Sequence, residues 1–174
     1  MDLIVLRRDP RTIGMCFGWD VHGRPQPVTE SSLRNLFAVL PPTERAPDGV
    51  QALLQAARDA CIASLVSYNV LPFGVLASLH AIEAALRAKI ELAGGSAEGR
   101  GRQPLPWRAL WDRAVSLKLI APEEDGDEDI VETGRRVRNM FSHPKTSMVM
   151  PYAMALPMII TSHRVVARLF PALP

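Results

Sequence analysis

Apolar side chains recur at three- and four-residue steps through most of the chain after Pro47, which is the period of amphipathic helices. The first stripe comprises Val50, Leu54, Ala57, Cys61, Leu65 and Tyr68, and the second comprises Val75, Leu79, Ile82, Leu86 and Ile90. Asp48 with Gln51 forms a capping-box pattern before the first stripe, and Pro72 suits the first turn of a second helix. We therefore predict two long helices, the second ending at Gly94-Gly95.

The pattern predicts three more helices further along the chain. One begins at Pro106, continues through Leu119 and carries the apolar residues Trp107, Leu110, Trp111 and Ala114. It follows a Gly- and Arg-rich stretch, 94–103, that we interpret as a flexible link. The next carries Ile130, Gly134, Val137 and Phe141 on one side and ends near Pro144. The last is predicted over Met150 to Phe170, with Pro157 either kinking it or marking its start.

The first 47 residues follow another pattern. Apolar residues occupy every second position from Ile13 to Val21, as in a half-buried strand, and Leu3 to Leu6 is the expected partner across an Asp9-Pro10 turn. The stretch His22 to Pro25 ends this hairpin, and Thr29 is placed to cap a short helix through Leu40. The predicted fold is therefore mainly α: an up-and-down bundle of four to five helices over 48–174, with a small β-hairpin extension over 1–47.

Composition fits a single soluble domain, with 174 residues, 48% hydrophobic and 22% charged. The longest apolar run, Met148 to Ile160, is too short for a membrane span and contains two prolines, so we expect it in the core. The amino terminus lacks the apolar segment of a secretory signal, and Cys16 and Cys61 have no partners at metal-ligand spacing. We expect buried, reduced thiols in a cytoplasmic protein.

The net charge of +2 hides an asymmetry along the chain. Seven acids and no base lie between Ala121 and Glu132, whereas six bases and no acid follow from Thr133 onward. A basic carboxy-terminal third would attract a polyanion such as RNA. The alternative is that acids at the start and bases at the end of a helix complement its dipole.

The most informative motif is Arg138-Asn139-Met140-Phe141-Ser142-His143, at the end of a predicted helix. At a helical period of about 3.6 residues, Asn139 and His143 lie one above the other, with Arg138 beside them. A guanidinium that stabilises phosphate charge, an imidazole that moves a proton and an amide that orients one of them suffice to cut RNA without a metal. Alternatively, Arg138 is a helix-terminal base, Asn139 a solvent residue and His143 a cap over the last carbonyls.

Other polar residues are candidates for accessory roles. His80, Glu83 and Arg87 recur at i, i+3 and i+7 on the second helix and would extend the site, although an internal Glu83–Arg87 ion pair is the more common arrangement. Arg135 shares the side of its helix with Asn139 and His143. Bases would stack on Trp107 and Trp111, or both rings belong to the core. Arg100 and Arg102 contact RNA or lie in a solvated loop. His22 and His163 lack partners at ligand spacing, and no metal or cofactor is expected.

The helices from Asp48 to Phe170, the segment Ala81 to Arg87, and Arg138, Asn139 and His143 together resemble the HEPN superfamily. That family is a helical bundle, usually dimeric, found in prokaryotic toxins and antiviral defence proteins, and many members are metal-independent endoribonucleases. Its signature is an Arg, commonly followed by Asn, Asp or His, with a His a few residues later. The resemblance covers about the last two thirds of the chain.

The resemblance implies that the RNA 2′-hydroxyl attacks the adjacent phosphorus, leaving a cyclic phosphate and a free 5′-hydroxyl. His143 would act as acid or base, Arg138 would hold the phosphate oxygens and Asn139 would position His143 or touch phosphate. Because one His does not readily serve both the attacking 2′-oxygen and the leaving 5′-oxygen, a homodimer would supply a second copy of His143. An antitoxin or defence partner protein is also implied; Lys145 stands where members silenced by a nucleotidyltransferase antitoxin carry Tyr, which argues against that particular partner.

A second class of function stays open: a noncatalytic HEPN-like dimerisation or ligand-binding module that uses the hairpin and the apolar helices for association. A DNA-binding regulator ranks last, because the sequence lacks helix-turn-helix spacing and the net charge is modest.

Overall fold

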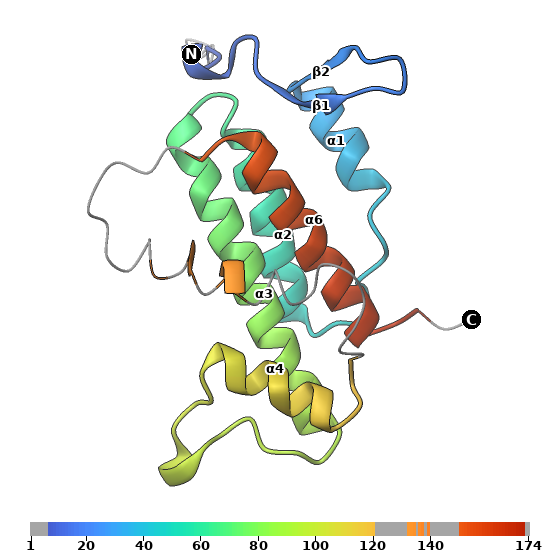
Figure 1. The fold of residues 1–174 in the computed structure, drawn as a ribbon, viewed down its shortest axis with the longest axis vertical. Helices are drawn as coiled ribbons and strands as arrows, with labels where there is room; N and C mark the ends of the chain where they lie inside the picture. Colours follow the sequence, from blue (N-terminus) through green and yellow to red (C-terminus); the bar gives the residue numbers. More distant parts are fainter. Residues whose placement is uncertain (1–6, 121–131, 135, 138, 140–149, 173–174) are drawn as a thin grey trace, which may run out of the picture.

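Three long helices pack side by side and form the body of the molecule (Figure 1). They are α2 (Asp48–Ala63), α3 (Leu71–Leu92) and α6 (Tyr152–Leu169). A fourth helix, α4 (Trp107–Ser116), lies against the end of α3 that is lower in the figure. The computed structural model describes residues 7–120, 132–134, 136–137, 139 and 150–172. Within these residues the protein is mostly helical with one small antiparallel sheet.

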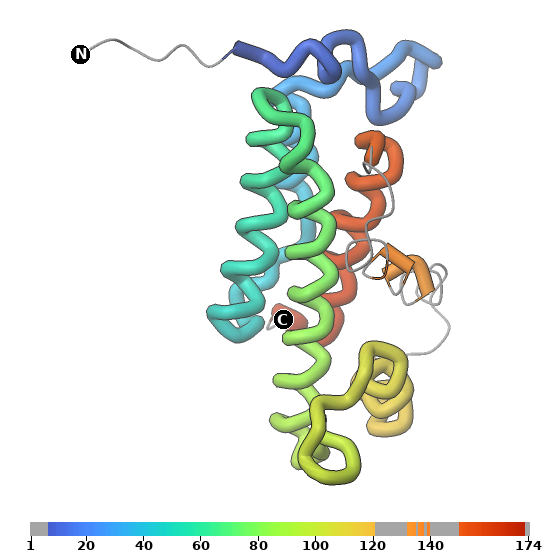
Figure 2. The backbone as a smooth tube through the Cα atoms, turned by 90° about the vertical axis from the view of Figure 1, so that its left-hand side faces the viewer, coloured from blue at the N-terminus to red at the C-terminus, as the bar shows by residue number. Residues whose placement is uncertain are grey.

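The centre of the bundle is α3, which is buried on most sides. All five apolar positions of its predicted stripe have 0% exposed surface: Val75, Leu79, Ile82, Leu86 and Ile90. The helix is covered by α2, α6 and α4 (Figure 2), which explains why its apolar residues extend beyond a single stripe. Its half-buried residues include His80, Glu83 and Arg87, which share one side of the helix at three- and four-residue spacing. We call these three residues the α3 polar row.

The start and end of α2 differ from the prediction. Pro47 is the residue before the helix and makes no side-chain cap, so the capping box of Asp48 and Gln51 is wrong. The side-chain amide of Gln51 instead donates to the carbonyls of Glu44 and Ala46, at 3.0 and 2.7 Å. The helix ends at Ala63, and the last two residues of the predicted stripe are buried beyond it because a 3-10 turn, η2 (Tyr68–Val70), returns the chain to the core. Those two residues are Leu65 and Tyr68.

The hairpin forms later in the chain than the pattern predicts. Strand β1 (Cys16–Trp19) pairs antiparallel with β2 (Pro25–Pro27), so His22 to Pro25 belongs to the hairpin rather than ending it. The carboxylate of Asp20 accepts hydrogen bonds from the backbone N–H groups of His22 and Arg24, and Gly23 supplies the positive φ of the turn. The predicted partner, Leu3 to Leu6, lies outside the described residues.

Two prolines in β2 occupy positions that need no backbone donor. The Asp20–Arg24 and Val28–Met15 backbone hydrogen bonds fix which residues of this strand face β1. By the alternation of an antiparallel pair, the backbone N–H and C=O of Gln26 point toward Gly18 of β1, whereas the backbone groups of Pro25 and Pro27 point away from β1. Proline therefore removes no ladder bond here, and the outer edge of β2 has no N–H at either position.

The short helix α1 (Glu30–Ala38) confirms the prediction for this segment. Thr29 accepts from the backbone N–H of Ser32 at 3.0 Å, and the Ser32 hydroxyl accepts from the backbone N–H of Thr29 at 2.8 Å. The predicted burial of both cysteines is correct only for Cys61, where burial raises the thiol pKa to about 12. Cys16 is exposed because it opens β1 on the side away from the half-buried Phe17.

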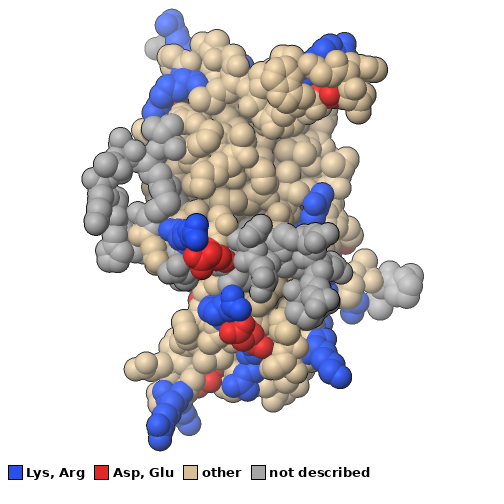
Figure 3. Space-filling view, in the orientation of Figure 1, with Lys and Arg blue, Asp and Glu red and all other residues tan. Residues whose placement is uncertain are grey.

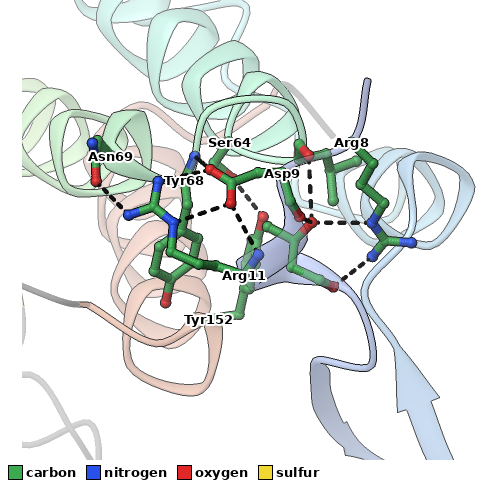
Figure 4. A network of polar contacts seen from close by, with 9 residues as sticks. Arg8, Asp9, Arg11, Ser64, Tyr68, Asn69 and Tyr152 are labelled. Carbon is green, nitrogen blue, oxygen red and sulfur yellow. Dashed lines mark hydrogen bonds and ion pairs between the residues drawn. The ribbon is translucent and has the colours of Figure 1, made fainter. Parts of the chain in front are cut away.

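A buried carboxylate joins the amino-terminal extension to the bundle (Figure 4). Asp9 accepts from the Arg11 guanidinium at 2.7 Å and from the backbone N–H of Tyr68 at 2.9 Å, and its own N–H donates to the carbonyl of Leu65 at 2.7 Å. The Arg11 side chain, followed by the backbone N–H groups of Tyr68 and Arg11, holds the pKa of Asp9 well below its usual range. Nearby, the hydroxyls of Ser64 and Tyr152 lie 2.6 Å apart and tie α2 to α6.

The closing helix α6 runs through Pro157, which lies inside it and does not mark its start. One stretch, Tyr68–Leu92, is long and apolar enough to cross a membrane by length and composition. More than half of its apolar window is buried inside the structure, as expected for the core helix of a soluble protein.

The closest helix approach that we identify predicts a stability difference between two glycines. A Cβ at Gly74 of α3 would lie 2.9 Å from the Ala57 carbonyl oxygen and 3.2 Å from the Ala60 Cβ of α2, whereas a Cβ at Gly49 meets nothing within 4 Å. We expect Gly74→Ala to lower the free energy of unfolding by about 1–3 kcal/mol, because the two helices must separate. The control Gly49→Ala should be neutral or stabilising by up to about 1 kcal/mol. Urea denaturation measures both, and equal effects would contradict the close approach.

Candidate functional site

The candidate motif is only partly described. Arg138, His143 and Arg135 lie outside the described residues, so the prediction that they converge stays a prediction. Asn139 has a helical backbone and an exposed side chain. We call the described residues among 132–139 the motif segment.

The motif segment packs against the middle of α3. A Cβ at Gly134 would lie 3.2 Å from Leu79 of α3 and 3.2 Å from the ring of Trp107, the first residue of α4. Val137 is 1% exposed, which confirms that this side of the predicted helix belongs to the core. Figure 1 shows the described part of the segment beside α3. Because Leu79 lies one helical turn from Glu83, the segment contacts α3 next to the α3 polar row.

The predicted ion pair of the α3 polar row is present. Arg87 donates to Glu83 at 2.9 Å, and both side chains are mostly buried, with 26% and 19% exposed. Charged groups at this depth are stabilised by charge-assisted hydrogen bonds. The pair therefore fixes the position of the Glu83 carboxylate near the motif segment.

Arg87 has a second role that the sequence does not reveal. Its guanidinium also donates to the backbone carbonyls of Ala97 at 3.2 Å and Leu105 at 2.8 Å, at the two ends of the connection from α3 to α4. Carbonyl acceptors have no side-chain signature, so sequence spacing finds only the Glu83 partner. With three acceptors, Arg87 is a structural clamp. We therefore interpret its predicted accessory role as positioning of the Glu83 carboxylate and of the α3–α4 connection.

The tryptophans near the motif segment belong to the core. Trp107 is 5% exposed and Trp111 is 4% exposed. This confirms their interpretation as core residues and leaves neither ring available for base stacking. Among the described residues, no group of three or more His, Cys, Asp or Glu side chains is arranged to hold a metal ion.

A buried histidine lies between α2 and α6. His163 is 1% exposed, and its Nε2 has no hydrogen-bond partner in the described part of the chain. Burial, together with the neighbouring positive charge of Arg58, lowers its pKa to about 4. This imidazole is therefore neutral at physiological pH.

An open hollow of about 620 Å³ lies between the hairpin and α1. Its lining combines apolar side chains, Phe17 and Leu36, with the amides of Gln26 and Asn35. The sequence pattern misses this hollow because it does not predict β2, whose residues form part of its lining. Its lining suits a small molecule with both apolar and hydrogen-bonding groups.

Comparisons of the chain with protein-family models, with curated proteins and with solved structures found no match.

The pKa of His163 predicts acid sensitivity in a defined pH range. Below pH 6.5 the unfolded chain gains a proton at this residue, whereas the folded protein does not gain it until about pH 4. Stability should therefore fall as the pH drops from 6.5 to 4, by at most about 3 kcal/mol. Urea denaturation of the wild type and His163→Leu across this range measures the effect. A loss of the same size in His163→Leu would contradict the assignment.

Proposed function

We propose that this protein is a metal-independent endoribonuclease of a toxin or antiviral defence system and that it acts in the cytoplasm. The proposal depends on one observation: the segment that carries the Arg138, Asn139 and His143 pattern packs on α3 at Leu79, one helical turn from a half-buried carboxylate, Glu83. The mostly helical fold and the resemblance of this pattern to the HEPN signature support it.

The chemistry of the proposed site follows from its residue types. His143, whose ordinary pKa lies near 6.5, removes the proton of the 2′-hydroxyl or protonates the departing 5′-oxygen. Arg138 stabilises the negative charge that develops on the phosphate oxygens. Asn139 orients the imidazole or hydrogen-bonds to phosphate. The bond from phosphorus to the 5′-oxygen breaks as the bond to the 2′-oxygen forms.

The α3 polar row supplies an acidic neighbour to this site. Glu83 is held by Arg87, so its position is fixed before substrate binds. In the proposed site Glu83 positions a cationic or imidazole group of the motif, with His80 one turn earlier on the same side of α3. Arg135 acts as an additional cation for phosphate.

We propose further that the active form is a homodimer. The mechanism needs a proton acceptor at one oxygen and a donor at the other, and a two-fold axis near the motif segment would bring together two copies of His143. An antitoxin or another defence protein is the expected heterologous partner.

The alternative is a noncatalytic dimerisation or ligand-binding module. One observation favours it: the area over the upper parts of α3 and α6 in Figure 3 carries no visible charged side chain where it is not covered by grey residues. Phe73 of α3 is 61% exposed and Met154 of α6 is 41% exposed. Apolar surface of this kind is typical of association sites.

Substitution of the motif distinguishes the two functions. We expect His143→Ala and Arg138→Ala each to reduce cleavage of total RNA in excess EDTA by at least about 100-fold, because each removes proton transfer or charge stabilisation. Arg136→Ala and His22→Ala are matched controls. Arg136 is an exposed neighbour in the same segment that pairs with Glu132 at 2.9 Å, and His22 is exposed on the hairpin. Absence of cleavage by pure wild-type protein would support the noncatalytic module, and full activity of His143→Ala would rule out His143 as the catalytic residue.

Sedimentation tests the dimer. We expect a dimer at the concentrations at which RNA is cut, and a fall in specific activity on dilution that parallels dimer dissociation. A monomer with undiminished cleavage would exclude the shared site.

A further inference from the structure

The connection from α3 to α4 forms a closed turn, which corrects its prediction as a flexible link. Glu98 and Pro104 form an antiparallel bridge, and the backbone N–H of Gly99 donates to the carbonyl of Gln103 at 2.8 Å. Gly101 and Arg102 adopt positive φ values of 76° and 60° at the tip of the turn. We call residues 98–104 the tip loop.

The tip loop is fastened to the helix that carries the α3 polar row. Leu105 donates from its backbone N–H to the carbonyl of Ala97 at 3.0 Å. The Arg87 guanidinium donates to the carbonyls of both Ala97 and Leu105. The clamp sets the two ends of the loop relative to α3. The cationic side chains on the tip loop are therefore presented from an ordered backbone, and binding through them costs less ordering entropy than binding through a flexible chain.

Positive charge gathers at this end of the molecule. Between Arg87 and Lys118, all of which the structure describes, there are seven bases and three acids. Four of the bases are exposed and make no ion pair within the described part of the chain: Arg100, Arg102, Arg113 and Lys118. Figure 3 shows Lys and Arg atoms at the lower end, on the tip loop and around α4.

We propose that the tip loop and α4 form a docking surface for the phosphate backbone of single-stranded RNA. This inference rests on the proposed function, because it names the surface that holds the substrate outside the candidate site. Helix α4 connects this surface with the motif segment, because its Trp107 lies against Gly134 and its last turn carries the exposed Arg113.

The chemistry of the surface also predicts how it binds. Trp107 and Trp111 are buried, so α4 offers no indole for stacking with bases. Contacts through arginine and lysine alone recognise phosphate and not base identity, and their strength falls steeply with salt because they release counterions. Binding at this surface is therefore independent of base sequence and strongly dependent on salt.

The test uses a fluorescent 2′-O-methyl oligoribonucleotide, which lacks the attacking hydroxyl and cannot be cut by the proposed mechanism. Fluorescence anisotropy gives its Kd against the full chain over a range of salt concentrations. We expect Arg100→Gln/Arg102→Gln to weaken binding about 25-fold at 0.1 M salt and to reduce the slope of log K against log salt by about 1.4, as the loss of two phosphate contacts requires.

The matched control is Arg7→Gln/Arg164→Gln, which removes the same net charge from two exposed arginines elsewhere. It should change Kd less than about threefold. An equal loss in both double variants, or no loss in the tip-loop variant, would overturn the proposal, as would wild-type binding to anionic vesicles but not to the oligonucleotide.

Cleavage of unmodified RNA by the same proteins separates this proposal from the proposed function. If the wild type cuts RNA but the tip-loop variant binds the oligonucleotide normally, the docking surface is wrong and the nuclease stands. If binding depends on the tip loop but no protein cuts RNA, the docking surface stands and the nuclease is wrong.

Discussion

Burial of α3 on most of its circumference is the constraint on which the other features depend. A 22-residue helix with apolar side chains on several faces must be covered by other helices, and α2, α6, α4 and the motif segment together provide that cover. The approach of α2 at Gly74 is so close that a single Cβ does not fit without movement. Ser78 is buried and donates to the Val75 carbonyl, and Lys89 and Glu91 lie in the last turn of the helix. The remaining polar side chains of α3, those of His80, Glu83 and Arg87, form the half-buried row beside the motif segment.

Arg87 connects this row to the rest of the basic end of the molecule. A guanidinium has five N–H donors in a fixed plane, and here its bonds go to one carboxylate and two carbonyls. Lysine has three donors without that planar fork and would not reproduce this arrangement. Through this residue the geometry next to the motif segment and the geometry of the tip loop are set together. The Glu83 carboxylate and the tip loop thus belong to one hydrogen-bonded unit.

The sequence predicts those parts of the fold whose signals are local. The stripe from Val75 to Ile90, the Thr29 cap and the Glu83–Arg87 pair all follow from helical spacing and are confirmed. The pattern does not predict β2, because a three-residue strand with two prolines has no alternation to detect. The Asp9 anchor and the tip loop depend on backbone acceptors and donors far along the chain, which leave no pattern in side-chain types. For the candidate site, Arg138 and His143 stay predictions from sequence, while the Glu83–Arg87 pair on α3 is a structural observation.

The prolines of β2 have a consequence for how this end of the molecule meets others. An exposed strand edge ordinarily offers a row of donors and acceptors on which a foreign strand can assemble. At Pro25 and Pro27 that row has acceptors without donors, so a neighbouring chain finds no continuous ladder to extend. Uncontrolled sheet growth from the hairpin is thereby disfavoured, although Trp19 and Val21 beside it are largely exposed. Recognition along this edge of β2 therefore depends on side chains, whose identity a partner can read, more than on a backbone ladder, whose hydrogen bonding is the same in every protein.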